Sequence, residues 1–328
     1  MRTRSKVPGG SKRKQVSDTT LFQYPPNKND REPTPNVTIF TKHDWQQLQS
    51  PRFLNDTIIS FFMQYHLDQK VNPEIKSRLH IFNSFFFAKI KSLRQKKNGI
   101  LPSYSHTSRW LKSVKIFTKD FLVMPVCEND HWLLIIVCYP ANLPRRDSHK
   151  IPDDELYEPA VFVLNSCAGL APAMKKALSQ FLKYQWEQEH ETTRNFNINQ
   201  AKRTGIRLVF PDLPQQKNSY NCGVYLLGYF YSFLNEPRQA YINMFRNRSL
   251  KAWFQDNNID ISRERSRMIN VVKNQISSWA SSGKAAFEQQ HAHDSKETLI
   301  ELKSQSDSSE IIEDGGLNAM EHHVIVIH

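Results

Sequence analysis

The sequence has no apolar run long enough to cross a membrane, and cysteine is scarce in it. No uninterrupted stretch approaches the ~18 apolar residues of a membrane-spanning helix, so no membrane span is expected. The basic N-terminal segment MRTRSKVPGGSKRK has no apolar stretch behind it, so we expect no secretory signal. Only four cysteines occur among 328 residues, at positions 127, 138, 167 and 222, and none forms a CxxC pair. Their spacing suits neither a disulfide framework nor a zinc site, which predicts a reduced nuclear or cytosolic compartment, no metal and no cofactor.

The net charge of +12 is unevenly distributed along the chain. Residues 1–20 carry six Lys or Arg and one Asp, whereas residues 281–328 carry three Lys and nine Asp or Glu. The middle of the chain is therefore strongly basic, which indicates an acidic partner such as nucleic acid or an acidic protein surface. Charge alone does not choose between these partners.

Composition divides the chain into three parts. Residues 1–35 mix basic residues with Gly, Ser, Pro and Asn, and are predicted to be a disordered arm. Residues 36–280 have the composition of a folded domain, and residues 281–328 are predicted to be a disordered acidic tail. The basic cluster at 12–14 is interpreted as a nuclear localisation signal or an electrostatic contact, with a solvated tail as the alternative.

Hydrophobic spacing within the middle part predicts an α+β domain. Bounded, largely apolar and β-rich runs predict strands at 121–126, 132–139, 161–165 and 206–210. Apolar residues at helical spacing predict helices at 58–65, 172–188, 222–234 and 261–276. Asn55 or Asp56 is a suitable N-cap for the first helix. The aromatic run HIFNSFFF (80–87) fits neither period.

Cys222 opens the predicted buried helix after a polar segment rich in turn formers. Backbone N–H groups and the helix dipole at such a position favour a thiolate, so we expect a lowered pKa for Cys222. A thiolate is a strong nucleophile, whereas a thiol inside an apolar core is inert. From its position alone, Cys222 is more often a small core residue than a nucleophile.

His131 lies immediately before a predicted strand, where a strand end can aim an imidazole into a cleft. Such a histidine is more often structural, but a cysteine nucleophile requires a base and a third group that holds the correct tautomer. Asn165 stands at the end of the next predicted strand and is placed to be that third group. The sequence therefore predicts a Cys–His–Asn arrangement.

Five blocks along the chain resemble, in order, those of the SUMO-specific proteases, also called sentrin- or ubiquitin-like-protein-specific proteases. The blocks are FLNDTIISFF (53–62), HIFNSFFF (80–87), KIFTKDFLVMPVCENDHWLLIIVCYP (115–140), VFVLNSC (161–167) and PQQKNSYNCGVYLL (214–227). The resemblance implies a papain-like cysteine protease fold of the ubiquitin-like-protein protease type. In that fold a central mixed sheet is flanked by helices and the nucleophile begins a buried helix. The long segment after the His131 strand, and YPPNK (24–28), resemble the branch that trims poly-SUMO chains.

The resemblance also implies roles for individual residues. Cys222 matches the nucleophile and His131 the general base. Gln216, six residues before the cysteine, matches the glutamine of the oxyanion hole, although its neighbour Gln215 could be confused with it. Such a donor is typically worth ~10²–10³ in rate.

Substrate-binding residues follow from the same resemblance. Trp132 matches a Trp that lines the narrow tunnel for the Gly-Gly tail of the modifier, and Asp56 is taken as a further substrate-binding residue. Phe53 stands where many members place a second tunnel Trp. Two further positions depart from the usual pattern, because Asn165 replaces the usual Asp of the triad and Asn221 replaces the usual Asp before the cysteine. Without the negative charge, Asn165 stabilises an imidazolium less.

The expected function is that of a cysteine isopeptidase that removes SUMO from conjugated proteins and trims SUMO chains. The partners are then SUMO and its conjugates, for a nuclear, monomeric enzyme whose main ligand is not nucleic acid. The segment with Leu299, Ile300 and Leu302, followed by an acidic run, resembles a SUMO-interacting motif that adds as a strand to a sheet edge. VIVI (324–327) is a second candidate. The alternatives are a protease for another modifier such as NEDD8, and a catalytically weakened SUMO-binding pseudoprotease.

Overall fold

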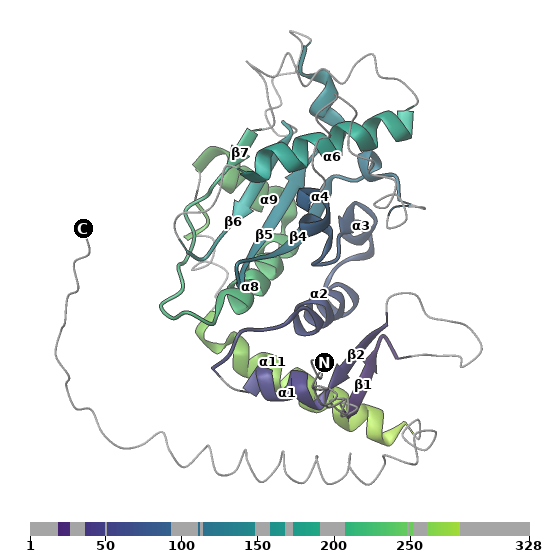
Figure 1. Ribbon diagram of the computed structural model, residues 1–328, viewed down its shortest axis with the longest axis vertical. Coiled ribbons are helices and arrows are strands. Elements are labelled where there is room, and N and C mark those ends of the chain that lie inside the picture. The colour runs from purple at the N-terminus through teal and green to yellow at the C-terminus, as the bar shows by residue number, and fades with distance from the viewer. Residues whose placement is uncertain are drawn as a thin grey trace, which may run out of the picture.

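A five-stranded mixed sheet forms the centre of the molecule, with its strands in the order β3-β4-β5-β6-β7 (Figure 1). The computed structural model describes residues 19–26, 37–49, 51–92, 111, 114–147, 158–167, 173–190, 207–247, 249–251 and 261–282. The strands are β3 (Leu79–Ile81), β4 (Phe121–Glu128), β5 (His131–Cys138), β6 (Ala160–Leu164) and β7 (Arg207–Val209). The central strands β4, β5 and β6 are mutually antiparallel, and the edge strands β3 and β7 run parallel to their neighbours.

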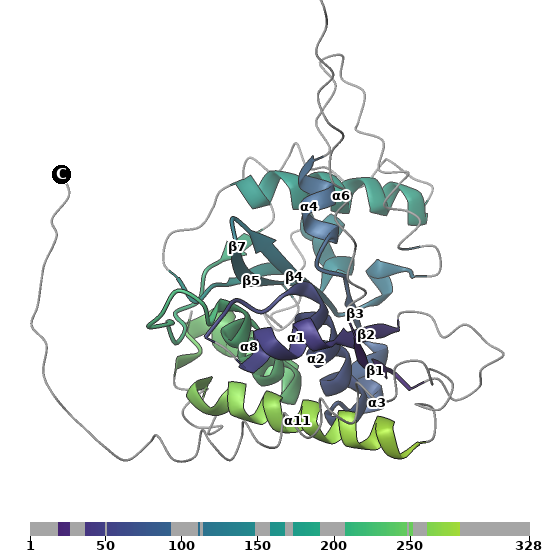
Figure 2. The ribbon, with the colours of Figure 1, turned by 60° about the horizontal axis from the view of Figure 1, so that its bottom comes forward.

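Helices cover both faces of the sheet, so the central strands are buried on both sides (Figure 2). Helices α4 (Phe86–Ser92) and α6 (Ala173–His190) cover one face. Helices α2 (Asp56–Lys70), α8 (Cys222–Asn235) and α11 (Ile261–Ser281) lie on the other. Side chains of β5 alternate between the two cores, with Leu134 and Ile136 facing α8, and Leu133 and Ile135 facing α6. This explains why β5 reads as a continuous apolar run.

The strands and helices predicted from apolar runs are present, with boundaries shifted by a few residues. Asn55 is the N-cap of α2, because its Oδ1 accepts a hydrogen bond from the N–H of Ile58 at 3.0 Å. The aromatic run that fitted neither period contains the end of strand β3 and the beginning of helix α4. Two short segments of different type therefore share it, which is why no single spacing emerged.

The boundary of the folded domain lies earlier than predicted, because part of the expected 1–35 arm is a strand. Strand β1 (Thr20–Tyr24) pairs antiparallel with β2 (Thr38–Thr41). Phe22 is buried and stacks on Phe40, with ring centroids 4.8 Å apart. The strand is only five residues long and its apolar residues do not alternate regularly with polar ones, so the polar composition around it hid the strand. The remainder of the arm, residues 1–18 and 27–35, lies outside the described residues.

Short elements complete the described part of the chain. They are α1 (Lys42–Gln49), α3 (Pro73–Ser77), η2 (Ile116–Thr118), η3 (Pro140–Asp147), α9 (Pro237–Ile242) and η5 (Asn243–Asn247). Across the described residues, no helix combines the length and apolar character that a membrane span requires. The tail from residue 283 onwards, with its candidate SUMO-interacting motifs, lies outside the described residues.

Candidate active site

A two-residue hairpin turn between β4 and β5 places His131 at the start of its strand. Glu128 and His131 are paired across the hairpin, so only Asn129 and Asp130 lie between the strands. Both turn residues have positive φ, 52° and 57°, a conformation that Asn and Asp adopt more readily than other side chains. This turn chemistry sets the register of β5 and leaves the imidazole half-buried at the end of this central strand.

Asn165 lies beside His131 because β6 runs antiparallel to β5 and ends where β5 begins. The Nε2 atom of His131 lies 2.6 Å from the Oδ1 atom of Asn165, which also accepts from the backbone N–H of Cys167 at 3.0 Å. A backbone N–H can only donate, so the atom facing it is the amide oxygen. His131 Nε2 must then carry a proton and donate it to Asn165. The other ring nitrogen, Nδ1, is left as the base.

Cys222 begins helix α8, as predicted, and its side chain is buried. The expectation of a lowered pKa is wrong for the protein in this state, because burial raises the pKa of the Cys222 thiol. Hydrogen bonds from backbone groups of Trp132 and Gly223 act in the opposite direction and lower the pKa in part. The helix N-terminus therefore favours the thiolate, but removal from water outweighs it. The contact with the Trp132 backbone also brings the sulfur next to the residue that follows His131.

Glycine at position 223 allows helix α8 to approach the segment before α2. A Cβ atom placed on Gly223 would lie 3.0 Å from Leu54 Cβ and 3.2 Å from Ile59 Cδ1. These distances are tighter than ordinary van der Waals contacts, so a methyl group there would require Leu54 or Ile59 to shift. The nucleophile-bearing end of α8 is thus packed tightly against the segment that precedes α2.

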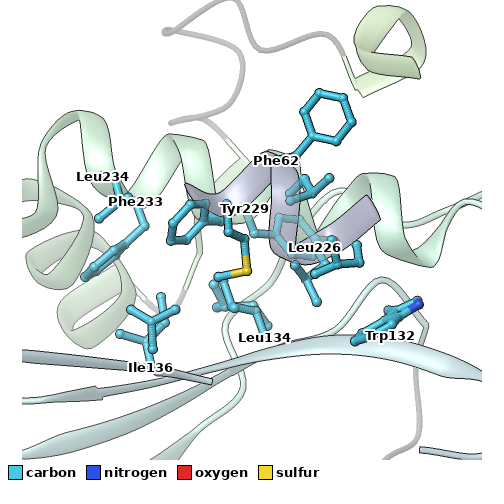
Figure 3. Close-up of a cluster of buried hydrophobic side chains, with 14 of the residues drawn as sticks. Phe62, Trp132, Leu134, Ile136, Leu226, Tyr229, Phe233 and Leu234 are labelled. Carbon is cyan, nitrogen blue, oxygen red and sulfur yellow. The ribbon is translucent and has the colours of Figure 1, made fainter. Parts of the chain in front are cut away.

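Trp132 is held by the same segment. Its indole Nε1–H donates to the carbonyl oxygen of Leu54 at 2.7 Å, and only 4% of the residue is exposed. Figure 3 shows its ring beside the cluster between the sheet and helices α2 and α8. Phe53, by contrast, is 45% exposed and free to meet a ligand, and Asp56 is the first residue of α2. Leu54, which follows Phe53, thus contacts both Trp132 and the start of α8.

The two adjacent glutamines make different contacts. The Nε2 atom of Gln215 donates to the carbonyl oxygens of Asn165 at 3.2 Å and Leu213 at 3.1 Å. The side chain of Gln216 instead donates to the carbonyl oxygen of Asn218 at 2.6 Å and accepts from the hydroxyl of Ser166 at 2.6 Å. The Gln215 side chain therefore links the segment before α8 to the end of β6. The Gln216 side chain lies in a second, separate network beside the candidate site.

Arg265 on helix α11 is a contact residue of the site that the sequence did not reveal. Its guanidinium donates to the carbonyl oxygens of Leu48 at 3.0 Å and Arg52 at 2.9 Å, and to Asn221 Oδ1 at 3.0 Å. It thereby joins the end of α1, the segment carrying Phe53 and the residue before the nucleophile. Arg265 lies 44 positions from Asn221 in the sequence, and no local pattern marks such a pairing.

A thiol on a helix N-terminus, with an imidazole and an amide oxygen on neighbouring strands, is the arrangement that cysteine peptidases use for nucleophilic catalysis. Among the described residues no group of three or more His, Cys, Asp or Glu side chains could hold a metal ion. Comparison with known families agrees with this class. The chain belongs to the Ulp1 protease family, whose C-terminal catalytic domain matches residues 52–268.

Individual relatives support the assignment. Residues of this chain are 34% identical over 205 residues to the probable ubiquitin-like-specific protease 2B of Arabidopsis thaliana, covering 62% of this chain and 22% of that protein. They are 29% identical over 300 residues to sentrin-specific protease 7 of Mus musculus, covering 74% and 27%. They are 29% identical over 259 residues to ubiquitin-like-specific protease 2 of Schizosaccharomyces pombe, covering 71% and 38%. The chain thus spans less than half the length of these relatives.

A solved structure confirms the predicted fold class. The crystal structure described as that of "the de-sumoylating protease" superimposes with a TM-score of 0.57 at 21% sequence identity. The match covers 82% of this chain and 95% of the other. At this identity the likeness establishes the fold: a central mixed sheet flanked by helices.

Proposed function

We propose that the protein is a cysteine isopeptidase that removes SUMO from conjugated proteins and trims SUMO chains. The observation that carries the proposal is the 2.6 Å contact between His131 Nε2 and Asn165 Oδ1, which leaves Nδ1 as a base on the residue before Trp132, whose backbone contacts the Cys222 sulfur. Membership of the Ulp1 family supports the reaction class. Relatives named as ubiquitin-like-specific and sentrin-specific proteases support the substrate class.

In the proposed reaction, the sulfur of Cys222 attacks the carbonyl carbon of the C-terminal glycine of the modifier. His131 accepts the thiol proton at Nδ1 and then donates it to the departing lysine amine. Gln216 donates a hydrogen bond to the oxyanion of the tetrahedral intermediate. Water then hydrolyses the thioester by the same route, which releases the modifier and restores the thiol. Burial raises the pKa of Cys222, so transfer of the thiol proton to His131 is a required part of the proposed attack.

Substrate recognition is assigned to Trp132, Phe53 and Asp56. Trp132 is held rigidly by its bond to Leu54, whereas Phe53 presents an exposed ring. Two aromatic side chains on either side of a Gly-Gly tail would exclude substrates with larger residues there. This discrimination explains how such an enzyme spares ordinary peptide bonds.

The proposal extends to the parts outside the described residues. We assign the segment with Leu299, Ile300 and Leu302 as a SUMO-interacting motif, the segments before β1 and after α11 as arms beside a catalytic domain, and the nucleus as the compartment. We take the enzyme to be a monomer. Deleting residues 283–328 is expected to weaken cleavage of long SUMO chains more than that of a single conjugate. Equal losses on both substrates would exclude a role of the tail in chain binding.

A panel of modifier probes tests the proposed function. SUMO, NEDD8 and ubiquitin carrying an electrophilic C-terminus are each incubated with the wild type and with Cys222→Ser. The expected result is covalent labelling by the SUMO probe that Cys222→Ser abolishes. Preferential labelling by NEDD8 would reassign the modifier.

The neutral Asn165 and the raised pKa of Cys222 favour one alternative, a SUMO-binding pseudoprotease. It predicts SUMO binding, measured by calorimetry, without labelling or cleavage of any chain.

A further inference from the structure

Ser166 is a buried polar residue that contacts Gln216 twice. It follows Asn165 at the end of β6 and is only 1% exposed, so its hydroxyl requires a partner inside the protein. The hydroxyl lies 2.6 Å from Gln216 Oε1, and the Ser166 carbonyl oxygen accepts from the backbone N–H of Gln216 at 3.1 Å. One residue therefore holds both the main chain and the side chain of Gln216.

The two contacts of the Gln216 amide determine which of its ends is the nitrogen. A glutamine amide has the same shape in both orientations, so its hydrogen-bond partners must decide. The atom that faces the Asn218 carbonyl oxygen, 2.6 Å away, must be the nitrogen, because a carbonyl oxygen can only accept. The amide oxygen then faces Ser166, and the Ser166 hydroxyl must donate to it. The amide is held in one orientation from both ends.

This orientation matters because the amide nitrogen carries two N–H groups. One of them donates to Asn218, and the other has no partner among the residues that the structure describes. Rotating the amide by half a turn would present the oxygen instead, and two oxygens would then face each other at Asn218. The terminal torsion of glutamine is broad and roughly two-fold, so a partner on each side is what excludes the rotated form.

We propose that Ser166 is a positioning residue, which keeps the free N–H of Gln216 directed at the oxyanion of the reaction. This inference rests on the proposed function, in which Gln216 donates to the tetrahedral intermediate. Ser166 itself does not contact the substrate. Removing the Ser166 hydroxyl therefore weakens binding of the transition state only, so this change lowers kcat and leaves KM unchanged.

A double-mutant cycle tests the proposal with SUMO carrying a fluorogenic C-terminal amide. Ser166→Ala is expected to lower kcat about threefold to tenfold, the size expected for one neutral hydrogen bond, with KM within about twofold. Gln216→Ala is expected to lower kcat about 10²–10³-fold. Adding Ser166→Ala to Gln216→Ala should change nothing further, because the group that Ser166 positions is already absent. If the two losses multiply instead, Ser166 acts independently of Gln216 and the proposal is wrong.

Alkylation of Cys222 by iodoacetamide separates positioning from a structural effect. The reaction needs no oxyanion donor, so Ser166→Ala should react at the wild-type rate, and a changed rate would indicate a distorted site. Ser166→Thr keeps the hydroxyl and should retain kcat within about threefold. Ser232 is a buried serine on α8, outside the Ser166–Gln216 network, and Ser232→Ala is the matched control. This variant should have the kcat and KM of the wild type. Failure of wild-type cleavage would refute the proposed function, whereas normal cleavage by Gln216→Ala would refute only the oxyanion role and the Ser166 proposal with it.

Discussion

Replacing Asn165 with Asp should make the Cys222–His131 pair more reactive. The Asp carboxylate would keep both present contacts, to His131 Nε2 and to the Cys167 N–H, and would add a negative charge. That charge would lie about 4 Å from the centre of the imidazolium, an attraction of about 4 kcal/mol at an effective dielectric constant of about 20. The site is partly open to water, so we expect about 1.4–2 kcal/mol, a tenfold to thirtyfold larger population of the thiolate–imidazolium pair.

The rate of iodoacetamide alkylation at pH 7, followed on the Cys222 peptide by mass spectrometry, reports this population. Asn165→Asp should raise the rate by about tenfold or more, since the thiolate is the reacting form. Asn165→Ala removes the acceptor and is expected to lower kcat/KM for SUMO cleavage at least tenfold, with little change in the melting temperature. An unchanged alkylation rate in a folded Asn165→Asp variant would refute the reasoning, because another residue would then orient His131.

Three further predictions concern the scaffold around the site. Burial lowers the pKa of His66, which stacks on Tyr231, to about 4, so the unfolded chain takes up a proton near pH 6.5 that the folded protein resists. The free energy of unfolding should therefore fall by up to about 3 kcal/mol between pH 6.5 and 4, and His66→Phe should flatten that decline in urea titrations; an equally steep decline would exclude His66 as its source. Arg265→Met loses the guanidinium hydrogen bonds to Leu48, Arg52 and Asn221 and should lower stability by about 2–4 kcal/mol and reduce kcat/KM, with Arg265→Lys recovering only part of either; wild-type melting and kinetics would show that these bonds do not hold the site together. Gly223→Ala should cost about 1–3 kcal/mol in thermal unfolding because the new methyl meets Leu54, although Ala usually stabilises a helix, and a stabilised variant would show that the segment yields.

Local pattern was a reliable guide wherever an element is long and buried on both sides. Strands β4 and β5 and helix α8 follow directly from bounded apolar runs, because burial of both faces leaves no polar positions to obscure them. Strand β1 escaped detection because its five residues are too few to outweigh the polar composition on either side. Phe22 is buried by ring contacts with Phe40 and Phe61, which no local window contains.

The residues of the candidate site could be predicted from local sequence, but their arrangement could not. His131, Cys222 and Asn165 could be singled out from the sequence because each stands at a boundary between a polar turn and an apolar element. Their relative geometry could not, since it depends on the antiparallel register of β5 and β6. The expected low pKa of Cys222 failed for this reason, because helix position is local whereas burial of the sulfur depends on packing.

The sequence by itself therefore determined the fold class, the family and the chemical groups available to the site. Only the tertiary structure decided how those groups are oriented. The tautomer of His131, the amide orientation of Gln216 and the position of Arg265 each depend in part on a hydrogen bond between residues 34 to 50 positions apart. Periodicity and turn chemistry act over a few neighbouring residues. Contacts at such separations exist only after the chain has folded, and they are what converts a cysteine, a histidine and two amides into a directed site.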